Sequence, residues 1–167
     1  TIVAGMGLTA LEGLITDVLK LENNDFASLV ETRVMLETNA ASLAAQRRTS
    51  EDIINIQKAS KAYAKKVEGG HRAIEEDLMF HLKIAEASKN SVLKSLMLVI
   101  IPDIISSFIK LDICKEDHFN KVLNEHDEIV KCIVNKEAEL ASKAMRLHLT
   151  DVLDYSNNLK QGNGRLL

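Results

Sequence analysis

The sequence has few of the residues that are typical of β-rich folds. Among its 167 residues there are one proline, no tryptophan and seven glycines, and aromatic residues make up 4%. Strands favour aromatic and β-branched residues, and the turns between them favour glycine and proline, so this composition indicates a helical protein. The length suits one domain with one core and is short for two domains.

Cysteine and basic charge are also scarce. Cys114 and Cys132 are the two cysteines, too few for a disulfide framework and typical of reduced thiols in the cytoplasm. The net charge of -3 does not favour direct DNA binding by this segment, because phosphate contacts need a concentrated basic surface. The apolar run from Leu96 to Ile101 meets Pro102 well before the ~20 residues that a membrane span needs. We therefore expect a cytoplasmic chain without a membrane span.

Hydrophobic periodicity predicts an all-α fold, a compact bundle of about seven helices. The helices are expected at about residues 8–22, 25–47, 49–68, 71–89, 90–111, 117–134 and 137–158. Thr49 and Asp52 resemble a capping box at the start of the third helix, and Pro102 should kink or break the fifth. Residues 1–7 are expected to be an extended lead-in, and residues 159–167 a flexible tail.

Three of the predicted helices carry a histidine in the middle of an apolar face. In the segment DLMFHLKIAEASKN, residues 77–90, Asp77 and His81 lie four residues apart and share one face of a helix. The same spacing places His126 and His148 at the centres of the apolar faces of the last two predicted helices. All four side chains should therefore point into the core.

Together, Asp77, His81, His126 and His148 predict a metal site. A single core-facing histidine is typically a neutral ring bonded to a carbonyl or hydroxyl group. Three rings and a carboxylate without partners would cost roughly 1–3 kcal/mol each. One shared divalent ion removes this cost, because imidazole nitrogen and carboxylate oxygen are both good metal ligands.

Arg33 is a charged residue within an apolar stripe, and it needs an anionic partner because its guanidinium cannot lose its proton. Glu37 follows four residues later, at the separation of an ordinary surface pair. The alternative partner is a carboxylate or phosphate of a small molecule that enters the bundle beside the metal. The sequence leaves both open. His71 and His118 lie near helix starts and are expected at the surface.

Three segments resemble the effector-binding (FCD) domain of the FadR-type GntR bacterial transcription regulators. They are RVMLETNAASLAAQR (residues 33–47), DLMFHLKIAEASKN (77–90) and EHDEIVKCIVNKEAELASKAMRLHL (125–149). The motifs that carry the resemblance are R-x-x-L-E from Arg33, D-x-x-F-H from Asp77, A-S-x-N from Ala87 and A-M-x-x-H-L from Ala144. The resemblance covers about residues 8–158 and implies an antiparallel helical bundle.

The same resemblance implies how the domain works. It implies a divalent metal, which we expect to be zinc or nickel, bound by Asp77, His81, His126 and His148. It makes Arg33 a wall of the effector cavity, where small organic acids bind, and it implies a homodimer. The opening residues TIVAG are similar to the end of a winged helix-turn-helix domain, so residues 1–7 are expected to be the end of that domain or its linker.

We therefore predict an effector-sensing and dimerisation domain of a transcription regulator, not an enzyme, that contacts DNA only through a preceding N-terminal domain. The alternative is a metal-dependent enzyme acting on a small organic acid, since three histidines and a carboxylate can also activate water. Hydrolysis usually needs a separate general base, and the sequence indicates no further acidic residue mid-face on the histidine-bearing helices. A third alternative keeps the fold without a metal.

Overall fold

The described part of the chain consists of helices joined by short loops. A computed structural model describes residues 26–110 and 119–163, and within these ranges it contains seven helices and no strand. The helices are α2 (Phe26–Arg47), α3 (Ser50–Glu68), α4 (Ile74–Ala87), α5 (Ser91–Lys110), α6 (Phe119–Val134), α7 (Ala138–His148) and α8 (Thr150–Asn163). The predicted all-α class is confirmed. The helix expected at residues 8–22 lies outside the described residues, as do residues 1–7 and 164–167.

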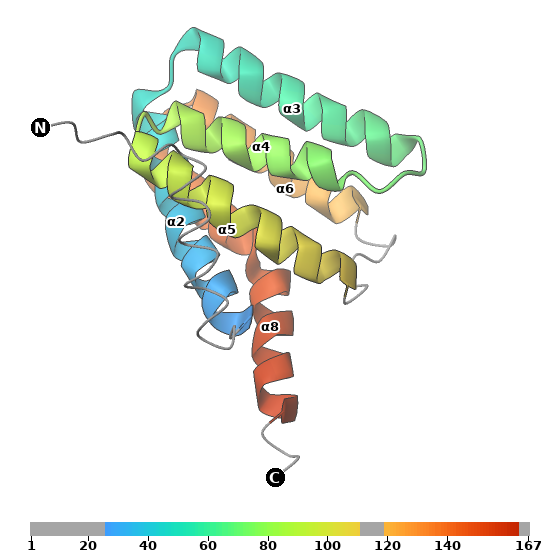
Figure 1. Ribbon diagram of the computed structural model, residues 1–167. Helices are drawn as coiled ribbons and strands as arrows, with labels where there is room; N and C mark the ends of the chain where they lie inside the picture. Colours follow the sequence, from blue (N-terminus) through green and yellow to red (C-terminus); the bar gives the residue numbers. More distant parts are fainter. Residues whose placement is uncertain (1–25, 111–118, 164–167) are drawn as a thin grey trace, which may run out of the picture.

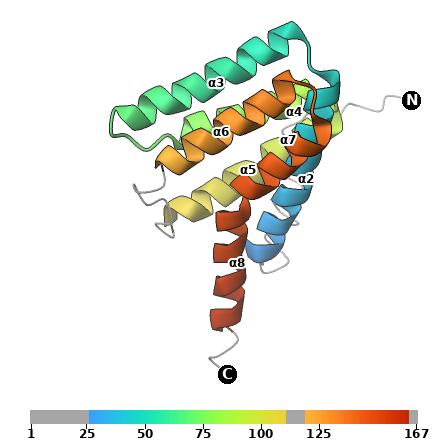
Figure 2. The same ribbon diagram turned by 180° about the vertical axis from the view of Figure 1, so that it is seen from behind.

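The helices form an antiparallel bundle that is crossed by α2. Along the chain, α3, α4, α5 and α6 run in alternating directions (Figure 1). Helix α2 lies across this set and packs against α4, α5, α6, α7 and α8, and α7 lies beside it when the bundle is seen from behind (Figure 2). Because α2 contacts so many other helices, its side chains reach the centre of the molecule.

Alanine allows α2 to pack closely at the centre. Ala40, Ala41, Ala44 and Ala45 are all fully buried in the main core cluster, which also contains Phe80 of α4. Small side chains let two helix backbones approach, whereas larger ones at these positions would hold the helices further apart. The close approach brings the polar side chains one or two turns away on α2 into the interior.

The loops that flank α3 and α4 follow from local sequence signals. Thr49 caps α3 in a capping box with Asp52, as predicted, and α3 ends at Glu68 with Gly69 as its C-cap. Gly70 has a φ of 73°, a conformation that glycine adopts without strain, and it reverses the chain towards α4. The capping box and this turn together fix where α3 starts and how it leads into α4.

Two arginines at the end of α2 tie other helices to it. Arg47 donates from Nη1 to the Ser88 carbonyl (3.1 Å), which follows the last turn of α4. Arg48 donates from Nη2 to the Val134 carbonyl (2.5 Å) at the end of α6. Carbonyls at helix C-termini lack partners within their own helix, and a positive charge there also opposes the helix dipole. These contacts help to hold α4 and α6 in register with α2.

Helix α5 continues through Pro102, so of the predicted kink or break the break is excluded, and the kink stays a prediction. A proline removes one backbone donor and commonly bends a helix, but the hydrogen bonds before and after it can carry the helix on. In spite of the apolar run in α5, no helix among the described residues is long and apolar enough to cross a membrane.

The last predicted helix is two helices, which is a second difference. Helix α7 ends at His148 and α8 starts at Thr150, with Leu149 buried between them. The Thr150 hydroxyl donates to the Arg146 carbonyl (2.9 Å), a back-bond that often bends helices. Helix α8 then turns away from the bundle and extends to Asn163, into the segment expected to be a tail (Figure 1).

We predict that Asp52→Asn lowers the free energy of unfolding by about 1 kcal/mol at about pH 7, as is typical for the loss of a helix cap. Asp52 accepts from the Thr49 backbone (2.7 Å) and from Lys89 Nζ (2.7 Å), and these bonds keep its pKa below the ordinary value although partial burial acts to raise it.

A carboxyl group whose folded pKa is lowered stabilises the fold above the unfolded pKa of about 3.9, and the stabilisation is lost as the pH falls through the folded value. The difference between wild type and Asp52→Asn should therefore narrow below about pH 4. Urea unfolding followed by circular dichroism measures this difference in the free energy of unfolding. The exposed neighbour offers the matched control Glu51→Gln, and an equal loss in that variant would contradict the assignment.

Candidate metal centre

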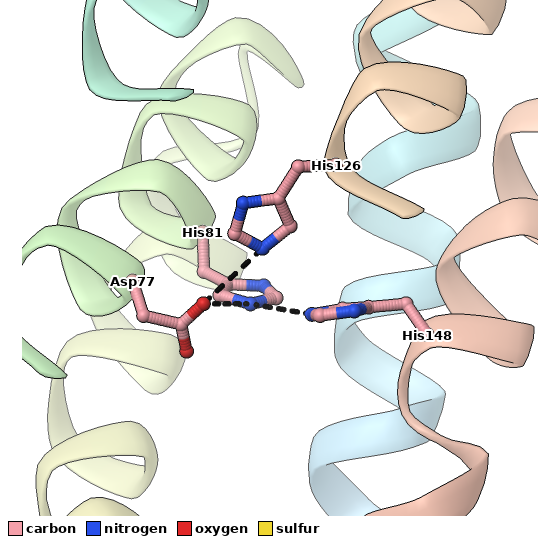
Figure 3. A group of neighbouring side chains, drawn as sticks. All are labelled: Asp77, His81, His126 and His148. Atoms are coloured by element: carbon pink, nitrogen blue, oxygen red, sulfur yellow. Dashed lines mark hydrogen bonds and ion pairs between the residues drawn. The ribbon is translucent and has the colours of Figure 1, made fainter. Parts of the chain in front are cut away.

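Four side chains from three helices converge at one point in the bundle. Asp77 and His81 project from α4, His126 from α6 and His148 from the last residue of α7 (Figure 3). Each offers one ligand atom, and these atoms lie within 4.8 Å of one another. His81 and His126 are fully buried, the His148 side chain is 7% exposed and the Asp77 side chain 25%. The structure thus brings together all four residues that the sequence singled out.

The distances between these atoms match those expected around one ion. Asp77 Oδ1 lies 3.2 Å from His126 Nε2 and 3.7 Å from His81 Nε2. His148 Nε2 lies 3.3 Å from His81 Nε2. Metal–nitrogen bonds of about 2.0–2.1 Å put two ligands of a tetrahedral ion roughly 3.3 Å apart. The residues therefore fit a divalent cation bound through Nε2 atoms and a carboxylate oxygen.

Two carboxylates orient two of the rings from the opposite side. Glu37 Oε2 is in ion-pair contact with His81 Nδ1, and Glu125 Oε2 lies 3.0 Å from His148 Nδ1. A carboxylate at Nδ1 favours the tautomer with a proton on that nitrogen, which leaves the Nε2 lone pair free. In that tautomer the Nε2 lone pairs of His81 and His148 face each other over 3.3 Å, an arrangement that a shared cation would stabilise.

Unsatisfied polar atoms gather at this centre. In the part of the chain that the structure describes, five buried side-chain atoms have no hydrogen-bond partner: Glu37 Oε2, Asp77 Oδ1, His81 Nδ1, His126 Nδ1 and His126 Nε2. Buried polar groups without hydrogen bonds are rare in proteins, and each calls for an explanation. All five belong to the four converging side chains or to Glu37. Glu37 Oε2 and His81 Nδ1 are in ion-pair contact with each other, and an ion would engage Asp77 Oδ1 and His126 Nε2.

The protonation states suit a cation ligand set. Burial lowers the pKa of His126 to about 4, so its ring is neutral near pH 7 and its lone pair is available. Burial alone would raise the pKa of Asp77, but the imidazoles of His81 and His126 lower it well below its usual range. Metal ligands must be deprotonated in this way, because a proton and a metal ion compete for the same lone pair.

Aromatic rings pack around His126. The Phe80 ring stacks on it, with centroids 3.9 Å apart and planes 22° apart, and the Tyr63 ring lies tilted against it at 4.8 Å. Phe80 and Tyr63 are both buried. Because apolar walls restrict the ring to one orientation and limit the access of water, Nε2 of His126 stays directed towards Asp77.

Arg33 pairs with Glu37 within the core. The two side chains are 3% and 1% exposed, and Arg33 Nε donates to Glu37 Oε1 over 2.5 Å. The sequence had offered Glu37 only as an ordinary surface partner, and the burial of the pair corrects that expectation. His71 is exposed, as predicted, and His118 lies outside the described residues.

Sequence reasoning missed the roles of Glu37 and Glu125. The sequence places Glu37 four residues after Arg33 and Glu125 directly before His126, but neither spacing indicates a histidine on another helix as the partner. Glu125 lies on a histidine-bearing helix, so the expectation of no further acidic residue at the site on those helices is corrected by this residue, whereas Glu37 lies on α2. Both carboxylates face Nδ1 atoms, however, and so approach the rings on the side away from the cluster of Nε2 atoms.

Comparisons with known proteins give the family. The FCD domain model matches residues 28–151. The chain is 31% identical over 153 residues to the HTH-type transcriptional regulator LutR of Bacillus subtilis, covering 89% of this chain and 70% of that protein. It is also 31% identical over 139 residues to a putative L-lactate dehydrogenase operon regulatory protein of Escherichia coli, covering 80% of this chain and 53% of that protein.

A comparison with solved structures points to the same family. Streptococcus agalactiae GntR superposes with a TM-score of 0.67 at 27% identity, covering 78% of this chain and 58% of that one. The chain spans about half to 70% of the length of these relatives. The two named sequence relatives are regulators, in agreement with the prediction that the chain is not an enzyme. Since the family model matches most of the chain, the chain belongs to the FCD domain family, the effector-binding domains of GntR-type transcription regulators.

Proposed function

We propose that this domain senses a small carboxylate-bearing metabolite through a divalent metal ion, zinc or nickel, bound by Asp77, His81, His126 and His148. The observation that carries the proposal is the cluster of three Nε2 atoms and one carboxylate oxygen within 4.8 Å of one another. Two of these atoms, Asp77 Oδ1 and His126 Nε2, have no hydrogen-bond partner among the described residues. A bound ion would supply positive charge and any coordination positions beyond the four protein ligands for the oxygens of the effector.

The protein residues orient and shield the effector site. Glu37 and Glu125 hold two of the rings, and Phe80 packs against the third. Arg33 donates to Glu37 through Nε, so in our proposal its terminal amino groups are left to bind a carboxylate of the effector. One relative is named for an L-lactate dehydrogenase operon, and L-lactate is a small hydroxy acid of the proposed class.

Regulation requires that the effector favours one arrangement of the whole protein. In the proposed arrangement, the domain forms a homodimer in the cytoplasm, and a preceding winged helix-turn-helix domain, of which residues 1–7 are the end or linker, binds DNA. Residues 8–158 then form the sensor. A coupling of about 1–3 kcal/mol between effector and DNA would change occupancy about 5- to 150-fold.

The alternative, a metal-dependent enzyme acting on a small organic acid, is less consistent with the geometry. A hydrolytic metal site needs a base within reach of the water on the ion. The two additional carboxylates face Nδ1 atoms instead, and each is already engaged by a histidine. The positions of Glu37 and Glu125 therefore favour holding the ligands over activating water.

Metal binding is tested first. Protein purified without a nickel column should contain about one divalent ion per chain by elemental analysis. His126→Ala should lower the metal content sharply, because it removes a buried ligand, while the matched control His71→Ala, at an exposed histidine, should leave it unchanged. Wild-type protein that stays metal-free after incubation with zinc and with nickel would favour a metal-independent sensor.

Effector binding is tested with a panel of small hydroxy, keto and dicarboxylic acids that includes L-lactate. A metal-loaded chain should be stabilised in thermal unfolding by at least one of them. Arg33→Lys should weaken the binding of that acid about tenfold, because the ammonium group of lysine keeps the charge but lacks the planar set of donors of the guanidinium. The exposed Arg146 gives the control Arg146→Lys. Turnover of the acid by the purified domain would support the enzyme alternative instead.

The regulatory step needs a longer chain that includes the DNA-binding domain. The acid that binds should change the affinity of that protein for its operator in a gel shift, and Arg33→Lys should need a proportionally higher acid concentration for the same change. An operator affinity that no binding acid alters would contradict the proposal.

A further inference from the structure

Glu37 contacts two different basic groups with its two oxygens. Oε1 lies 2.5 Å from Arg33 Nε, and Oε2 is in contact with His81 Nδ1. The carboxylate is 1% exposed, Arg33 is 3% exposed and His81 is fully buried. Within the described residues, no hydrogen bond reaches Oε2 or His81 Nδ1, so these two atoms have only each other. One buried carboxylate therefore joins the guanidinium of α2 to a ring of the metal cluster.

Two basic side chains flank this carboxylate inside the core, and Arg33 carries a permanent positive charge. A buried carboxylate is costly unless its charge is paired and its oxygens accept hydrogen bonds. Arg33 and His81 thus each pair with one oxygen of Glu37, and neither oxygen is left for another partner.

We infer that Glu37 is a positioning residue that holds the Nδ1 proton of His81 and is shared with Arg33, so that the acid site and the metal site depend on each other through one carboxylate. The inference rests on the proposed function, because it assigns Nε2 of His81 to the metal and Arg33 to the effector. A proton held on Nδ1 leaves Nε2 as an acceptor directed at Asp77 and His148.

The other histidines of the cluster lack this link. Glu125 holds His148 in the same manner, but it is 3.7 Å from the half-exposed Lys121 instead of a buried guanidinium. His126 Nδ1 has no hydrogen-bond partner in the described part of the chain. Glu37 is therefore the carboxylate through which a change at Arg33 reaches a metal ligand.

Glutamine cannot replace Glu37, because it has too few acceptor oxygens. The amide has one acceptor oxygen, whereas Glu37 uses two. Arg33 cannot lose its proton, so it should claim the single oxygen and leave the amide NH2 facing His81. His81 must then turn its acceptor nitrogen towards the NH2 and carry its proton on Nε2, where it competes with the metal.

The test measures metal affinity with zinc and cobalt alone, by competition with a chelator. Glu37→Gln should weaken binding about 10- to 100-fold, and the exposed control Glu31→Gln on the same helix should not change it. Adding Arg33→Met to Glu37→Gln frees the amide oxygen for His81, so the double variant should bind metal more tightly than Glu37→Gln alone. An unchanged affinity in Glu37→Gln, or no recovery in the double variant, would overturn the inference.

A second measurement avoids dependence on the variants folding. Long-range nitrogen NMR of the metal-free wild-type chain should show His81 protonated on Nδ1, and protonation on Nε2 would overturn the inference. If the wild type binds neither metal but shows the Nδ1 tautomer, the proposed function fails while the Glu37 contact is upheld. The two failures are therefore distinguishable.

Discussion

The central constraint in the structure is the convergence of three imidazole rings and one carboxylate in a small buried volume. Three imidazoles direct Nε2 at one another and at Asp77, with separations of 3.2 to 3.7 Å for three of the pairs. Carboxylates at Nδ1 of His81 and of His148 favour the proton on that nitrogen, so the two Nε2 atoms, 3.3 Å apart, are then both acceptors. A divalent cation satisfies all of them at once, and it would also tie α4, α6 and α7 together at a point where their packing alone leaves polar atoms unpaired.

Helix α2 contributes none of the four clustered side chains, yet it orients one of them, His81. Its buried alanines let it lie against α4, and one turn before Ala41 it presents Glu37 to His81. Arg33 follows one turn further towards the N-terminus and neutralises the carboxylate. The small residues and the charged pair depend on each other. If α2 packed closely without Arg33, the buried carboxylate of Glu37 would lack a charged partner on its own helix. If α2 did not pack closely, Glu37 would not reach His81.

Periodicity predicted most of the bundle and the four converging side chains, because the pattern of apolar residues at helical spacing is local information. It could not predict the bend at Leu149, since the apolar face of α7 runs on into α8 and the Thr150 back-bond leaves no trace in that pattern. Nor could it predict the role of Glu37. Its spacing from Arg33 is that of a surface pair, and only the packing of α2 on α4 makes it a buried partner of His81.

The positions of the two carboxylates around the rings favour a binding site over a hydrolytic one. A hydrolase would keep a free base on the Nε2 side, where water on the ion would lie. Here Glu37 and Glu125 sit behind the rings, and each fixes a ligand rather than accepting a proton from a substrate. In the proposed site, the two carboxylates would keep the rings oriented, and the acid would be bound by Arg33 beside them. Binding of that acid would then favour one arrangement of the protein over another, as a sensor requires.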